Sequence, residues 1–125
     1  MSQYAKTALV VDDSQTERLN LATILQNAGC MVLQAASGND AYEAAQEHQP
    51  GVIFLDILME NGDGYQTCRQ LKRNPVTAAI PVIMVSTKAN PVDIQWASRL
   101  GACDYIVKPY TEQAILASLA KASAS

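Results

Sequence analysis

Short runs of consecutive apolar residues alternate along this chain with segments whose apolar residues recur every three or four positions. Consecutive apolar residues lack the in-and-out alternation of a half-exposed strand and suit strands that helices cover on both faces. The pattern therefore predicts five buried parallel strands. The runs are Ala8–Val11, Met31–Leu33, Val52–Leu55, Val82–Val85 and Tyr105–Val107.

The segments between the runs carry helix signals. Ser14 to Glu17 has the spacing of a capping box, the apolar residues that follow lie on one face, and Gly29 is a natural stop. The other predicted helices are 39–47, which ends before Pro50; 63–72; a segment that begins at the N-cap Asn90 and ends at Gly101; and a last helix capped by Thr111 that frays after Lys121.

This order is a strand and a helix repeated five times, which predicts an α/β fold with a doubly wound parallel sheet and right-handed crossovers. A length of 125 residues fits one domain. No Gly/Ser-rich linker interrupts the pattern. We therefore expect a single domain over residues 1–125 without an effector domain, and a monomer.

Composition excludes several classes of protein. The hydrophobic fraction of 49% argues against disorder, and a net charge of −3 gives no basic face for nucleic acid. The longest uncharged run, 19–39, contains too many polar residues for a membrane span, and the N-terminus has no signal-peptide core. The three cysteines do not have the sequence spacing of a disulfide framework or of a metal site, so we expect reduced thiols in a cytoplasmic protein. They are Cys30, Cys68 and Cys103.

Polar residues follow four of the predicted strands. Asp12 and Asp13 come after the first, Asp56 after the third, Ser86 after the fourth and Lys108 after the fifth. Ligands of open α/β sheets bind beyond the carboxyl ends of the strands, at the switch point of the winding. If the first and third strands are neighbours, the three carboxylates converge. An isolated Asp12–Asp13 pair would fit a solvated turn before a helix better than a site, but polar residues at the other strand ends favour the site.

Converging carboxylates require a cation, since two of them about 4 Å apart repel by roughly 4 kcal/mol at an effective dielectric constant near 20. Oxygen ligands without His or Cys favour a hard ion, and an open site suits Mg²⁺ with phosphate oxygens in its shell. Lys108 and the hydroxyl of Ser86 are suited to hold phosphoryl oxygens. The implied reaction is phosphoryl transfer to a carboxylate, with Asp56 as the nucleophile.

Four motifs occur in order along nearly the whole chain: V-V-D-D-S, F-L-D-I-L-M-x-x-x-D-G, P-V-I-M-V-S-T-K and D-Y-I-V-K-P. This set resembles the response-regulator receiver domain of two-component signalling. The resemblance implies a flavodoxin-like fold with strand order 2-1-3-4-5 and five helices. It also implies a phospho-accepting switch, which is not an enzyme beyond its own phosphotransfer and dephosphorylation.

The resemblance also implies roles for the candidate site residues. Asp56 matches the family's phosphoacceptor, and Lys108 matches its characteristic lysine. The peptide bond between that lysine and the following proline is often cis in the family. For Mg²⁺, Asp13 would be a direct ligand, Asp12 a ligand through water, and the backbone carbonyl of Leu58 a further ligand. Taken alone, Lys108 would be an ordinary surface lysine, but its position before Pro109 at the end of a strand favours a place in the site.

Two further positions match the family's switch residues, the hydroxyl of Ser86 and the aromatic ring of Tyr105. Core packing is the alternative for Tyr105, and Trp96 fits either an apolar anchor or an exposed contact. The implied partners are a histidine kinase or its phosphotransfer domain, and an unknown downstream protein. That protein would bind the face formed by the fourth helix, fifth strand and fifth helix.

A narrower resemblance is to stand-alone regulators of type IV pilus (twitching), chemotaxis-like systems. It rests on D-D-S-x-T-E, T-A-A-I-P, the S-T-K triplet and Trp96 before R-L-G. Three positions depart from the common receiver pattern: Glu60 replaces a usual Pro, Thr87 narrows the lip over Asp56, and Leu58 offers no polar side chain to orient an attacking water.

Other functions compete with the signalling switch. A Mg²⁺-dependent phosphohydrolase would also use an aspartyl nucleophile, but it would carry a second Asp two residues on and a cap insertion. A flavin carrier is disfavoured because Asp12 and Asp13 would repel the flavin phosphate. A receiver that only drains phosphoryl groups from a kinase, without a downstream target, remains an alternative.

Overall fold

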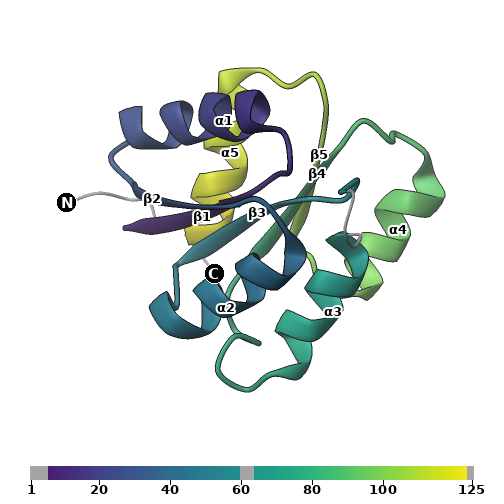
Figure 1. The fold of residues 1–125 in the computed structure, drawn as a ribbon. Coiled ribbons are helices and arrows are strands. Elements are labelled where there is room, and N and C mark those ends of the chain that lie inside the picture. The colour runs from purple at the N-terminus through teal and green to yellow at the C-terminus, as the bar shows by residue number, and fades with distance from the viewer. Residues whose placement is uncertain (1–5, 60–63, 124–125) are drawn as a thin grey trace.

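The computed structural model describes residues 6–59 and 64–123 (Figure 1). Strands and helices alternate along the chain as the sequence predicts. The elements are β1 (Thr7–Val11), α1 (Gln15–Asn27), β2 (Met31–Ala35), α2 (Gly38–His48), β3 (Val52–Asp56), α3 (Gly64–Arg73), β4 (Val82–Ser86), α4 (Pro91–Arg99), β5 (Asp104–Val107) and α5 (Glu112–Ser123).

The five strands form one parallel sheet in the order β2-β1-β3-β4-β5, as the resemblance implied. Helices cover both faces, with α1 and α5 on one side and α2, α3 and α4 on the other (Figure 1). The chain reverses its direction of winding between β1 and β3, so the carboxyl ends of these two central strands lie at the switch point where ligands bind in such sheets.

Two apolar clusters lie on opposite faces of the sheet. Successive residues of a strand point to opposite faces, so Leu9 and Ile53 pack toward α2 and α3 while Val10 and Phe54 pack toward α1 and α5. The central strands β3 and β4 are buried at every position. This burial on both faces explains why consecutive apolar residues marked the strands.

The prediction that every strand is buried on both faces was wrong for the two outer strands. Met31 at the start of β2 is 71% exposed, and Val107 at the end of β5 is 37% exposed. An outer strand has a neighbour on one side only, so the helices that cover the central strands shield it less completely. An apolar run alone does not distinguish a central strand from an edge strand.

The element boundaries differ from the prediction at places that matter. Asp56 and Ser86 are the last residues of β3 and β4 and do not follow them. Helix α5 continues through Ser123 and buries Ala122 against the core, so the predicted fraying was wrong for 122–123, while 124–125 lie outside the described residues. The Asn90 cap is confirmed. Position 63, the predicted start of the third helix, and Glu60 lie outside the described residues.

The Lys108–Pro109 peptide bond is cis, as the resemblance implied. Among the helices described, none combines the length and the apolar character that a membrane span requires.

The first residue of α3, Gly64, lies directly behind Asp56. Its N–H donates to the carbonyl of Ile57 at 2.8 Å. A Cβ at this position would lie 2.4 Å from the backbone oxygen of Asp56 and 2.7 Å from the Cα of Ile57. The absence of a side chain therefore lets α3 approach the backbone that carries Asp56.

We expect Gly64→Ala to destabilise the protein by about 1–3 kcal/mol, because the new methyl group overlaps backbone atoms that have no room to move. Helix propensity alone predicts a small stabilisation, so the sign of the change is diagnostic. Urea unfolding followed by circular dichroism measures it. Gln70→Ala, an exposed change on the same helix, is the control and should leave stability close to that of wild type. A Gly64→Ala variant as stable as wild type would contradict this assignment.

Candidate functional site

Three carboxylates meet at the carboxyl ends of β1 and β3. One oxygen from each of Asp12, Asp13 and Asp56 lies within 4.8 Å of the other two. Asp12 and Asp56 are buried, with 6% and 5% of their surface exposed, while Asp13 is exposed. The predicted convergence is confirmed, and Asp13 leaves one side of the cluster open to solvent.

Backbone N–H groups fix the two buried carboxylates. The N–H of Ser14 donates to Oδ1 of Asp12 at 2.9 Å, and the N–H of Leu58 donates to Oδ1 of Asp56 at 3.2 Å. Each bond spans two residues, so it forms as soon as the loop after the strand turns. The guanidinium of Arg18 donates to the backbone oxygen of Asp12 at 2.8 Å and holds the same loop from the helix side.

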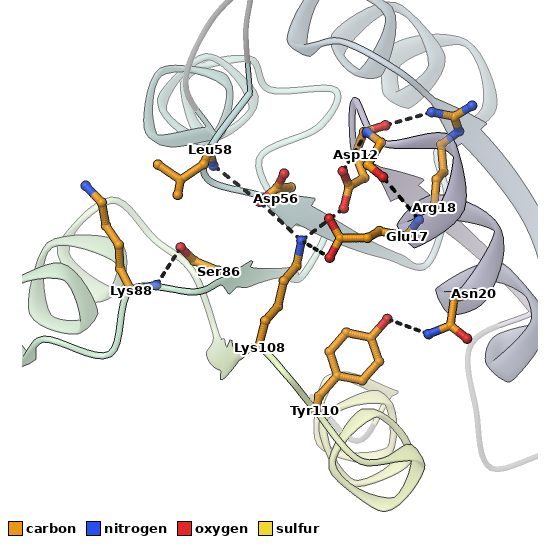
Figure 2. Close-up of polar contacts among 11 residues, drawn as sticks. Asp12, Glu17, Arg18, Asn20, Asp56, Leu58, Ser86, Lys88, Lys108 and Tyr110 are labelled. Atoms are coloured by element: carbon orange, nitrogen blue, oxygen red, sulfur yellow. Dashed lines mark hydrogen bonds and ion pairs between the residues drawn. The ribbon is translucent and has the colours of Figure 1, made fainter.

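Lys108 reaches the cluster from the end of β5, and Figure 2 shows its ammonium group between three carboxylates. Its Nζ lies 3.1 Å from Oδ2 of Asp12, 3.0 Å from Oε1 of Glu17 and 3.7 Å from Oδ1 of Asp56. Burial opposes the charged form of Lys108, but the bond with Glu17 and the attraction of Asp56 and Asp12 outweigh it and raise the pKa of this lysine. It remains an ammonium ion and offsets the buried negative charge.

Glu17 is the site residue that the sequence reasoning missed. Its backbone N–H bonds to Oγ of Ser14 at 3.3 Å, which confirms half of the predicted capping box. The other half does not form, because the N–H of Ser14 is bonded to Asp12 and the carboxylate of Glu17 turns to Lys108. The motif spacing indicated a local bond, whereas the actual partner comes from the other end of the chain.

The two predicted switch residues are in contact: Ser86 is the last residue of β4, and Tyr105 is the second residue of the neighbouring strand β5. Ser86 is fully buried, and its Oγ accepts a hydrogen bond from the N–H of Lys88 at 3.1 Å. The hydroxyl of Tyr105 donates to the carbonyl of Lys88 at 2.8 Å. Burial raises the pKa of Tyr105, and a hydrogen bond with Ser86 opposes that rise. Tyr105 is thus a half-buried residue with a polar partner and is more than a core side chain.

The crowded carboxylates change the acidity of Asp56. Burial first, and then the negative charge of Asp12, raise the pKa of the Asp56 carboxyl from 3.8 to about 7, while Lys108 and the Leu58 N–H partly offset the rise. Without a cation, this group is therefore only partly ionised near neutral pH. A divalent cation would favour the ionised form.

The donor set fits Mg²⁺. Three carboxylates lie close enough to share an ion, all the side-chain donors are oxygens, and the exposed side leaves room for water or phosphate ligands. Asp12, Asp13 and Asp56 are the side chains that could hold it, and the role of the Leu58 carbonyl stays a prediction.

Comparison with known proteins identifies the family. The profile described as "Response regulator receiver domain" matches residues 8–120. The chain belongs to this family. Receivers are partners of histidine kinases and downstream targets, and they bind Mg²⁺ at an acidic pocket, which corresponds here to the aspartate cluster.

Two relatives come from Pseudomonas aeruginosa. Protein PilH is 41% identical over 111 residues, which cover 89% of this chain and 92% of PilH. Protein PilG is 37% identical over 111 residues, with 89% of this chain and 82% of PilG covered. These similarities agree with the narrower resemblance indicated by the sequence.

Solved structures support the same fold. The receiver superimposes on the chemotaxis protein CheY4 of Vibrio cholerae with a TM-score of 0.88 and 29% identity, over 93% of this chain and 97% of that one. A response regulator from Chloroflexus aurantiacus gives a TM-score of 0.91 at 29% identity, with 96% and 98% covered.

The raised pKa of Asp56 predicts a pH-dependent stability in the absence of divalent cations. The folded state keeps a proton that the unfolded chain releases near pH 4, so stability falls as the pH rises from about 4 to 7. Asp56→Asn removes this loss, so we expect its stability advantage over wild type to be larger at pH 8 than at pH 5 by on the order of 2 kcal/mol. Urea unfolding in EDTA at both pH values measures it. An equal difference between the variant and wild type at the two pH values would contradict the prediction.

The Glu17 contact predicts a change in the acidity of Lys108. We expect Glu17→Gln to lower the pKa of Lys108, because a neutral amide stabilises the ammonium form less than the carboxylate of Glu17 does. The titration of the lysine Hε–Cε NMR signal measures this pKa. Glu43→Gln, an exposed change on α2, is the matched control. If the two variants give the same Lys108 pKa, Glu17 is not an energetic partner of Lys108.

Proposed function

We propose that this receiver accepts a phosphoryl group on Asp56 from a histidine kinase or its phosphotransfer domain. One observation carries the proposal: the Asp56 carboxylate lies within 4.8 Å of two other carboxylates and 3.7 Å from the ammonium group of Lys108. Charges of both signs therefore surround the point where a phosphoryl group would bind. The chain acts in its own phosphotransfer and is not an enzyme that turns over other substrates.

Mg²⁺ would be held by Asp12, Asp13, Asp56 and the Leu58 carbonyl. When bound, it neutralises the crowded carboxylates and the charge of the incoming phosphoryl group. An oxygen of Asp56 attacks the phosphorus atom, the bond from phosphorus to the donor breaks, and the donor leaves with that electron pair.

Lys108 and Ser86 stabilise the transferred group. In the unphosphorylated protein, Lys108 is shared among three carboxylates. Its ammonium then pairs with a phosphoryl oxygen, and the hydroxyl of Ser86 donates to another. If Ser86 turns toward the phosphoryl group, its contact with Tyr105 changes. This pair is the proposed switch that alters the face formed by α4, β5 and α5, where a downstream protein binds.

The pathway is proposed from the relatives. Similarity to PilH and PilG, and to a chemotaxis protein, favours a role in a chemotaxis-like system that controls twitching motility. The cytoplasmic location and the monomeric state stay predictions from the sequence.

Intact-mass spectrometry after incubation with Mg²⁺ and acetyl phosphate tests the phosphoacceptor. We expect wild type to gain one phosphoryl group and Asp56→Asn to gain none. Asp13→Asn should be phosphorylated about tenfold more slowly, because it weakens the cation site. Asp40→Asn, an exposed change on α2, should behave as wild type. A phosphorylated Asp56→Asn variant would overturn the assignment of the acceptor, and wild-type rates in Asp13→Asn would overturn the ligand assignment.

The side chain beside Asp56 predicts a long-lived phosphorylated state. Leu58 is 47% exposed at the edge of the site and has no polar group to orient an attacking water. We expect Leu58→Asn to speed dephosphorylation by about threefold to tenfold, since the new amide would position that water. Loss of the phosphoryl group over time, followed by intact mass, measures the rate. Leu19→Asn, on a leucine that is 46% exposed on α1, is the control. Unchanged or slower loss in Leu58→Asn would contradict the explanation.

A further inference from the structure

We infer that the groove between α3 and α4 is a docking site for an acidic peptide segment of a partner protein, with a bulky apolar side chain between its carboxylates. This site is separate from the aspartate cluster, and it borders the face formed by α4, β5 and α5 because both include α4. The inference does not depend on phosphorylation of Asp56.

The groove is an open cavity of about 420 Å³ between the two helices, which Figure 1 shows next to one another. Helix α3 lines it with a continuous stripe of polar side chains at positions i, i+3, i+4 and i+7: Gln66, Arg69, Gln70 and Arg73. All four residues are exposed. The spacing places them on one face of the helix, so they present a single surface to a ligand.

The stripe is cationic in a protein whose net charge is −3. None of the described lining residues is acidic, and none of the ion pairs found among the described residues involves Arg69 or Arg73. Two guanidinium groups one helical turn apart repel each other. Carboxylates relieve that repulsion and form paired hydrogen bonds with the planar guanidinium group.

The opposite wall is apolar and aromatic. Trp96 on α4 lines the groove and is 40% exposed, and Leu100 lies one turn further along. Tyr65 closes one side, and its hydroxyl donates to Oδ1 of Asp93 at 2.9 Å, which fixes the ring. Trp, Tyr and Arg are the residue types most enriched among the residues that dominate binding energy in protein interfaces, and all three line this groove. The wall is suited to an apolar side chain of the ligand.

A peptide fits this groove better than a nucleotide does. Phosphate groups are generally held by free backbone N–H groups at helix N-termini or in glycine-rich loops. Arg69, Gln70 and Arg73 lie beyond the first turn of α3, where backbone N–H groups are bonded within the helix, so both arginines offer side-chain donors only. The guanidinium groups of Arg69 and Arg73 lie one helical turn apart, a spacing that suits two carboxylates carried along a peptide.

Trp96 is the only Trp in the chain, so its fluorescence reports on the groove. The test titrates the full chain, without phosphodonor and at physiological salt, with a blocked peptide that carries glutamates on both sides of a central leucine. We expect a saturable change in Trp96 emission, and backbone NMR shifts confined to α3 and α4. The same peptide with glutamines in place of glutamates should bind about tenfold more weakly.

Charge reversal at single positions separates the groove from general electrostatics. Arg69→Glu and Arg73→Glu should each weaken binding by about tenfold. Lys121→Glu is the control, a charge reversal at an exposed residue of α5 on the opposite face of the sheet. It should bind within about twofold of wild type, because exposed charges are screened beyond about 8 Å.

Four outcomes would overturn the inference. The first two are equal binding of the glutamate and glutamine peptides, and wild-type affinity in Arg73→Glu. The third is displacement of the peptide by ATP at a concentration below that of the peptide. The fourth is a wild-type dimer in sedimentation that Arg73→Glu abolishes. The last two would assign the groove to a nucleotide or to a second copy of the chain. Because no phosphodonor is present, each result stands apart from the outcome of the phosphorylation test.

Discussion

The burial of like charge at the centre of the sheet is the constraint on which the rest of the site depends. Asp12 and Asp56 are almost completely shielded from water, and each would repel the other across the ends of β1 and β3. Lys108 extends from β5 to offset this repulsion, backbone N–H groups hold one oxygen of each carboxylate, and a proton on Asp56 reduces the charge further. An electrostatically costly arrangement of this kind is typical of functional sites.

The fold was predictable because its signals are local. Apolar runs identified the strands, and Asn90 and Ser14 marked helix starts that the structure confirms. The aspartates and Lys108 were also found, since residues that follow parallel strands share one edge. Strand order came with the family resemblance. Glu17 was missed because its partner is distant in sequence, and the incomplete burial of β2 depends on which strands end up at the edges.

Lys88 shows how one backbone segment connects the site to its surroundings. Its N–H bonds to Ser86, its carbonyl accepts from Tyr105, and its ammonium lies 4.0 Å from Asp93 on α4. Asp93 in turn accepts a hydrogen bond from Tyr65 on α3. Contacts therefore run without interruption from the end of β4 to both helices that border the groove. The sequence placed Lys88 in a motif but gave no indication of these three partners.

Nearly all the groups proposed for chemistry come from the ends of strands, and only Glu17 comes from a helix. The outer faces of the helices therefore supply no group to the proposed phosphotransfer chemistry. A lineage of such proteins can exchange those outer residues, and with them its choice of partners, while the reacting edge stays constant. Because the two regions are separate, many signalling pathways can diverge from one ancestral domain while the groups that react stay the same.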